Sequence, residues 1–373
     1  MSDETLAQLL QGITNLTWQS VVMMLIGGLL ILLAVAKEYE PLLLLPIGAG
    51  AILTNLPLSP LIGEDGMLSI LYAVGVRNEL FPLLIFIGIG ALTDFGPLLE
   101  NPKMVLLGAA GQFGIFLTLI LALLLGFDRN EAASIGIIGA IDGPTSIYVS
   151  GVLAPHLVGP ITVAAYSYMA LVPLIMPPVM RLLTTKAERS IRMPHTQREI
   201  SQRTRVLFPI IVTIAVGIAV PFATPLIGML MLGNLMRESR VVERLTHASA
   251  NELANVVTLF LALAIGSTMR GEDFLRLGTL AILGLGLLAF FLDTATGVLF
   301  GKLMNVFSGG KFNPLIGAAG ISAFPMAARV VQKEASREDF SNFILMHAMG
   351  ANAAGQVASV IAGGVLLALM GAG

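Results

Sequence analysis

Residues 134–151 read SIGIIGAIDGPTSIYVSG, an apolar run with helix breakers and a single carboxylate, Asp142. Hydrophobic segments lie on both sides, so this aspartate is expected at membrane depth, where a charge is costly unless something binds it. Gly143 and Pro144 interrupt a helix and free backbone groups that lipid cannot satisfy. The stretch therefore predicts a discontinuous helix that holds an ion, as in many transporters. The alternative is a structural Asp142 that caps a half-helix together with Thr145 and Ser146.

The composition of the 373-residue chain is that of a membrane protein, with 56% hydrophobic and 12% charged residues and a mean hydropathy of +0.87. It predicts an all-α polytopic membrane protein with about ten or eleven membrane elements, several of them re-entrant or discontinuous. The chain has no cysteine, which excludes disulfides and thiolate metal sites of its own. Its four histidines lack metal-ligand spacing, which argues against a transition-metal site.

The chain is expected to divide into an N-terminal interfacial segment, residues 1–17, and an integral membrane domain, residues 18–373. The segment 181–205 gives the clearest orientation signal, because its two acidic residues are outnumbered by Arg181, Lys186, Arg189, Arg192, Arg198, Arg203 and Arg205. Such a loop faces the cytoplasm. A basic linker can also bind nucleic acid, but between two hydrophobic spans the orientation signal is the favoured interpretation, and no nucleic-acid partner is expected.

A faint internal repeat relates two halves, residues 80–183 and 257–361. IGAL at 89–92 resembles IGST at 265–268, and the sequence IGA occurs at both 138–140 and 316–318. The repeat pairs the Asp142 stretch with residues 313–329, which read NPLIGAAGISAFPMAAR. Because transporter sites often lie between repeats, we expect a transporter-like fold in which the two broken-helix motifs meet near the membrane centre.

The second motif offers chemistry that the first one lacks. Asn313 and Ser322 supply neutral oxygens, Gly317 lets the backbone approach closely, and Arg329 adds a cation. Combined with the carboxylate of Asp142, these oxygens suit Na⁺ or a proton. Other roles stay open: Asn313 as a helix cap, Ser322 as a small packing residue, and Arg329 as a snorkelling residue at the membrane edge.

Together these motifs resemble the beta subunit of biotin-dependent, sodium-translocating decarboxylases, a family that acts on oxaloacetate, methylmalonyl-CoA or glutaconyl-CoA. The resemblance extends from about residue 20 to the end, and its most specific segments are residues 90–99, 108–116, 142–145 and 313–329. It implies that carboxybiotin, delivered on a carrier from the cytoplasm, is decarboxylated at this subunit. Na⁺ would move outward in the same reaction, and a proton would be consumed.

The resemblance also implies roles for single residues. Those implied to be catalytic are Asp142, Tyr168 and Arg329, with Arg329 also binding the carboxybiotin. Those implied to hold Na⁺ are Asp142, Asn313, Gly317, Ser322 and Asn352. The alternative for Tyr168 is an interface aromatic, although the resemblance favours the functional role. Asp293, at membrane depth, is a secondary candidate on the ion path. No role transfers to Asp94 or Gln356.

The partners that the resemblance implies are a biotin carrier protein or domain, a carboxyltransferase alpha subunit and a small membrane gamma subunit. The complex is expected to be oligomeric and to lie in the bilayer of the bacterial inner membrane. No lysine stands in a Met-Lys-Met setting, so the biotin is expected on another chain. The alternative function is an autonomous Na⁺-coupled carboxylate transporter or Na⁺/H⁺ antiporter, and a weaker one is a non-transporting scaffold.

Overall fold

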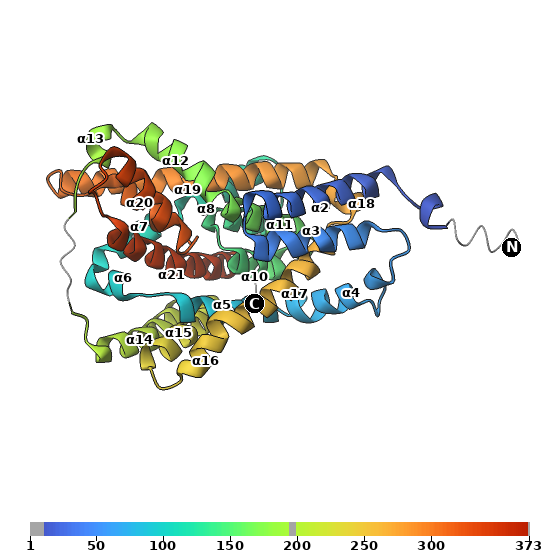
Figure 1. Ribbon diagram of the computed structural model, residues 1–373, viewed down its shortest axis with the longest axis horizontal. Helices are drawn as coiled ribbons and strands as arrows, with labels where there is room; N and C mark the ends of the chain where they lie inside the picture. Colours follow the sequence, from blue (N-terminus) through green and yellow to red (C-terminus); the bar gives the residue numbers. More distant parts are fainter. Residues whose placement is uncertain (1–10, 194–198, 372–373) are drawn as a thin grey trace, which may run out of the picture.

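The computed structural model describes residues 11–193 and 199–371, and all regular elements in these ranges are helical. Most long helices run roughly along the long axis of the molecule (Figure 1). Six are long and apolar enough to cross a membrane, or up to eight if each of two bent helix pairs forms one span. The all-α polytopic fold is confirmed, whereas the count of ten or eleven elements was a loose estimate that included short pieces. Most of the expected interfacial segment lies outside the described residues.

The chain begins with an antiparallel pair, α2 (Trp18–Lys37) and α3 (Pro41–Asn55). Thr17 starts α2 by accepting a hydrogen bond from the Ser20 N–H at 3.1 Å, which satisfies one of the free amides of the first turn. A 105° bend follows α3, and the chain continues through η1 (Pro60–Ile62), α4 (Met67–Leu71) and η2 (Tyr72–Arg77). Only 17% of the residues in the most apolar stretch of α2 are buried inside the protein. This helix therefore presents most of its surface outward, as expected for a helix at the periphery of a membrane protein.

The first predicted half holds the first broken segment. Its elements are α5 (Leu80–Leu92), α6 (Gly96–Glu100), η3 (Pro102–Met104), α7 (Val105–Ala110), α8 (Phe113–Leu124), α9 (Arg129–Gly136), η4 (Ile137–Ala140), α10 (Gly143–Leu153), η5 (Pro155–Leu157), α11 (Val158–Ala170) and α12 (Val172–Leu183). The helices on either side of Leu171 meet at 68°, just ahead of Pro173, whose missing N–H and ring favour a kink.

The rest of the chain begins within the basic segment, and the second predicted half, residues 257–361, extends from α17 into α21. The elements are α13 (Lys186–Arg189), α14 (Gln202–Ala219), η6 (Pro221–Ala223), α15 (Thr224–Ser239), α16 (Glu243–Ala248), η7 (Ser249–Leu253), α17 (Ala254–Gly266), α18 (Gly271–Phe274), α19 (Leu277–Phe307), η8 (Pro314–Gly320), α20 (Met326–Glu338) and α21 (Leu345–Met370). In both halves an apolar helix ends in a break, a span follows, then a broken segment, then a final span. This shared order supports the repeat, whose symmetry stays a prediction.

Two long helices of the second half, α19 and α21, form the interior. Half of the residues in the most apolar stretch of α19 and 61% of those in α21 are buried inside the protein, compared with 6% in α14. Both broken segments pack on α19, and the backbones of α19 and η8 meet directly at Gly297 and Gly301. A Cβ added to Gly297 of α19 would lie 2.3 Å from the carbonyl oxygen of Gly317 in η8. Only glycine fits there, so this contact fixes η8 against the central helix.

We expect Gly297→Ala to lower the free energy of unfolding by about 1–3 kcal/mol, because the added methyl group must push η8 away from α19. The measurement is the thermal unfolding midpoint of the purified protein in detergent. Gly284→Ala on the same helix is the matched control, since nothing lies within 4 Å of its added Cβ. Equal midpoints for the two variants would contradict the close packing of η8 on α19.

Candidate functional site: a buried carboxylate where two broken helices cross

The first broken segment turns sharply just before Asp142. Ile141 has a φ of 52°, in the left-handed region, which costs a side chain of this kind about 1–2 kcal/mol. Packing holds this conformation, because Ile141 is completely buried. Asp142 follows in an extended conformation as the N-cap of α10. Its side chain, only 3% exposed, is thereby directed into the protein interior.

The second broken segment crosses the first one at this turn. The N–H of Ser322 donates to the carbonyl oxygen of Ala140 at 3.1 Å. Its hydroxyl donates to Oδ2 of Asp142 at 3.0 Å. The two motifs that the repeat paired in the sequence therefore touch, through both a backbone and a side-chain hydrogen bond.

Helix α21 adds polar groups from one of its faces, at positions 352, 356 and 359. The Ser359 hydroxyl donates to Asp142 Oδ2 at 2.7 Å, and the Gln356 amide donates to the same oxygen at 3.2 Å. Asn352 donates to the carbonyl oxygen of Ile321 at 2.7 Å, beside the crossing. The spacing of three or four residues along a helix brings these side chains to the same face.

The carboxylate of Asp142 meets only neutral donors in the part of the chain that the structure describes. Oδ1 accepts the N–H of Thr145 at 3.1 Å, which is the capping role, and Oδ2 accepts the three side-chain donors. A buried carboxylate without a basic partner is costly, and a bound cation would remove that cost. Two further buried oxygens, Asn352 Oδ1 and Tyr166 Oη, have no hydrogen-bond partner within the described ranges. This donor set suits a hard cation.

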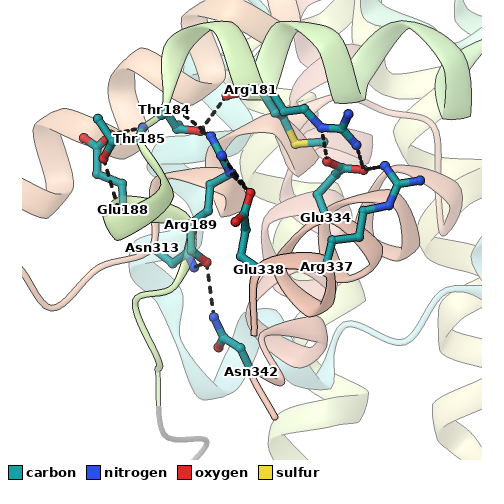
Figure 2. A network of polar contacts seen from close by, with 11 residues as sticks. Arg181, Thr184, Thr185, Glu188, Arg189, Asn313, Glu334, Arg337, Glu338 and Asn342 are labelled. Carbon is teal, nitrogen blue, oxygen red and sulfur yellow. Dashed lines mark hydrogen bonds and ion pairs between the residues drawn. The ribbon is translucent and has the colours of Figure 1, made fainter. Parts of the chain in front are cut away.

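Asn313 lies in a different polar network, at the end of the molecule that carries the basic segment (Figure 2). Its Nδ2 donates to the carbonyl oxygens of Arg189 and Ile191, both at 2.9 Å, while Oδ1 accepts the N–H of Leu315 at 3.0 Å. All of these contacts cap η8 and fix the basic segment to it. None of them reaches Asp142.

Ion pairs extend this network to α20. The guanidinium of Arg189 contacts Glu338 at 2.7 Å, and Arg181 contacts Glu334 at 2.7 Å. Hydrogen bonds from Ser341 and Arg192 lower the pKa of Asp339, so this exposed carboxylate also stays ionised. Figure 2 shows how Arg181 and Arg189 of the basic segment meet the glutamates of α20. The basic segment is therefore attached to the second broken element by charge.

Two other predicted site residues face α19 instead of the carboxylate. The hydroxyl of Tyr168 donates to the carbonyl oxygen of Leu283, and Gly317 packs on Gly297 as described above. The tyrosine beside Asp142 is Tyr166: a Cβ on Gly143 would lie 2.2 Å from its Cζ atom. The structure thus brings Asp142, Ser322 and Asn352 together at the crossing.

Arg329 lies in the first turns of α20 and is exposed. It lines a cavity of about 490 Å³ with Asp94, Arg237, Phe324 and Pro325. Within the described residues no hydrogen bond or ion pair engages the side chain of Arg329. Asp94 instead lies 3.5 Å from Arg205 and 3.8 Å from Arg237. The guanidinium of Arg329 is therefore available to an anion that enters this cavity.

Sequence reasoning missed Gln356, Ser359 and Tyr166 as neighbours of Asp142. A signal for the first two was present, because positions 352, 356 and 359 are polar in an otherwise apolar span and share one helical face. Tyr166 had no such signal. Its position depends on how α11 packs against Gly143, a contact between separate elements.

Comparison with known proteins identifies the family. Residues 19–370 match the family described as the Na⁺-transporting oxaloacetate decarboxylase beta subunit. The chain belongs to this family. Glutaconyl-CoA decarboxylase subunit beta of Acidaminococcus fermentans is 53% identical, with 96% of each chain covered. Methylmalonyl-CoA decarboxylase subunit beta of Veillonella parvula is 54% identical over 96% of this chain and 95% of its own. The oxaloacetate decarboxylase beta chain of Klebsiella pneumoniae is 47% identical, with 98% of each covered.

Family membership makes this chain the membrane beta subunit of a bacterial Na⁺-transporting decarboxylase. Its multi-pass helical structure fits a place in the inner membrane. As a beta subunit, it is one component of a larger enzyme. The main functional hypothesis from the sequence is therefore confirmed, and the autonomous transporter is not supported.

We expect Ser359→Ala to raise the Na⁺ concentration needed for half-maximal decarboxylation by roughly tenfold or more, because a hydrogen bond to a charged group contributes about 1.5–3 kcal/mol. The measurement is the Na⁺ dependence of the assembled complex. Ser150→Ala is the matched control: this serine is also fully buried, but its hydroxyl donates to the carbonyl oxygen of Ser146 in its own helix at 2.6 Å. An unchanged Na⁺ dependence in Ser359→Ala would remove this hydroxyl from the site.

Proposed function

We propose that this subunit decarboxylates carboxybiotin in the Arg329 cavity, moves Na⁺ outward from a site at Asp142, and consumes a proton. One observation carries the proposal: residues 322–325 contribute to both places. Ser322 binds the carboxylate of Asp142, and Phe324 and Pro325 line the cavity of Arg329. These four residues form one tight bend, in which the N–H of Phe324 donates to the carbonyl oxygen of Ser322 at 2.7 Å. A change in the cavity is therefore transmitted to the ion site through two or three residues.

Arg329 is proposed to bind the carboxylate of carboxybiotin. A guanidinium can form two parallel hydrogen bonds to a carboxylate, which orients the ligand as well as attracting it. The cavity wall also includes Leu345 and Met349, apolar side chains suited to the ring system of biotin. In the reaction, the bond between the ureido nitrogen and the carboxyl carbon breaks, CO₂ leaves, and the electron pair on nitrogen takes up a proton.

Asp142 is proposed to exchange a proton for Na⁺. The carboxylate, the hydroxyls of Ser322 and Ser359, and the free Oδ1 of Asn352 are the proposed ligands. Na⁺ binding displaces the proton from Asp142, which becomes available for the ureido nitrogen. Moving one charge against 100 mV requires about 2.3 kcal/mol, which the cleavage of carboxybiotin can supply for one or two ions.

The other roles taken from the resemblance have less support from the contacts. The bonds of Asn313 and the packing of Gly317 support structural roles in holding η8, and Tyr168 links α11 to α19. As Na⁺ ligands and a catalytic residue, respectively, these three remain proposals that rest on the resemblance. The proposed partners are a biotin carrier protein or domain, a carboxyltransferase alpha subunit and a small gamma subunit, in an oligomeric complex.

We expect Asp142→Asn to lower Na⁺-dependent decarboxylation by more than about 100-fold, because removing one charge from a buried ion pair costs about 3–5 kcal/mol. The measurement is Na⁺ uptake together with CO₂ release in vesicles that hold the complete complex. Avidin provides the control on the parent complex, since it must stop both processes by blocking the carrier biotin. Uptake near the parent rate in Asp142→Asn would make this aspartate purely structural.

Arg329→Lys is expected to raise the concentration of carboxylated carrier at half-maximal rate by roughly tenfold, because lysine keeps the charge but loses the paired hydrogen bonds. Na⁺ affinity should stay close to that of the parent. Arg337→Lys, at the other end of α20, is the matched control, because Arg337 contacts Glu334 at 2.6 Å and lies outside the cavity. Normal capture of the carrier with weakened Na⁺ binding would reverse the assignment of Arg329.

A further inference from the structure

Asp293 is a second fully buried carboxylate, and the proposed mechanism does not use it. It lies midway along α19 with no exposed surface. Its Oδ1 accepts the N–H of Gly114 at 2.5 Å. Gly114 is in the first turn of α8, so Asp293 caps the start of that helix from a neighbouring helix. This single bond accounts for one of its two oxygens.

The other oxygen, Oδ2, has no hydrogen-bond partner among the described residues. It is directed at the backbone of Gly139 in η4, where an added Cβ would lie 2.4 Å from Oδ2 and 3.2 Å from the methyl group of Ala289. No basic side chain pairs with Asp293 in the described ranges. The backbone nitrogen of Ile115 lies 3.4 Å from the same added Cβ. The charge of Oδ2 is thus faced by backbone and aliphatic carbon, with no cationic side chain from the described residues.

We propose that Asp293 is a second cation site, which holds a proton on Oδ2 at the junction of α19 with η4. The amides at the start of one helix do not replace the charged partner that a buried carboxylate needs. A hard metal cation prefers several carboxylate or carbonyl oxygens, and the described ranges hold no group of three or more His, Cys, Asp or Glu side chains that could bind a metal ion. A proton needs only the one free oxygen, and it removes the charge.

The position of this site connects it to both broken segments. Asp293 and Ala289 contact η4 through Gly139, and Gly297, one turn further along the same face of α19, contacts η8 through Gly317. Loss of the proton would place a charge where both segments rest on the central helix. The consequence for pumping rests on the proposed function, whereas the presence of the proton does not.

The test is infrared difference spectroscopy of the complete complex in lipid, which detects the C=O stretch of a protonated carboxylic acid. In the Asp142→Asn background, which removes the buried carboxyl group at the crossing, we expect a C=O band at near-neutral pH that shifts in D₂O and is lost when Asp293→Asn is added. Asparagine keeps the acceptor for the Gly114 N–H, so the cap on α8 is preserved. Asp94→Asn is the matched control and should leave the band unchanged, because Asp94 is paired with Arg205 at 3.5 Å.

A band that persists in the double variant Asp142→Asn/Asp293→Asn would show that the proton is elsewhere and overturn the proposal. Loss of the band on addition of Na⁺ at constant pH in Asp142→Asn would also overturn it, because Asp293 would then bind the metal ion. If Asp293→Asn does not assemble, Asp293→Glu gives a second test, since a protonated glutamic acid absorbs at a different wavenumber and the band must move. None of these measurements requires pumping, so the proposed function can fail independently.

Discussion

The structure depends on the burial of one carboxylate without a basic partner. Asp142 receives its hydrogen bonds from three separate places: the first turn of its own helix, the bend between η8 and α20, and one face of α21. All of these donors are neutral, so they stabilise the carboxylate without cancelling its charge. A site of this kind can release and rebind a monovalent cation, whereas a paired arginine would hold the carboxylate in one state.

The backbone is arranged to deliver those donors at the same depth. Each broken segment has amides and carbonyls that an unbroken helix would have satisfied, and the hydrogen bond between Ser322 and Ala140 pairs one set with the other. Helix α19 supports both segments through contacts that leave no space for side chains at Gly297 and Gly317. The interior is therefore rigid where the segments cross the central helix.

At the end that carries the basic segment, the same elements are held by charge. Arginines of the basic segment pair with glutamates of α20, and Asn313 links that segment to η8 (Figure 2). Arg329 belongs to the same helix but faces a cavity with no partner of its own in the described structure. The two sites differ in kind: at this end the buried charges of Arg189 and Glu334 are each paired with an opposite charge, whereas the buried carboxylate of Asp142 has only neutral donors among the described residues.

The sequence by itself determined the class of the protein and most of its chemistry. Apolar composition fixed a polytopic helical fold, and helix breakers beside Asp142 and Ser322 located the crossing, because both effects are local to the chain. The tertiary structure alone decided which polar groups complete the site. Asn313 was assigned to the ion by resemblance, yet its side chain caps η8 and binds the basic segment. Gln356 and Ser359 received no role, yet both bind Asp142. The reason is that partner choice depends on how helices far apart in the chain rotate and pack against one another, and no local pattern records that rotation.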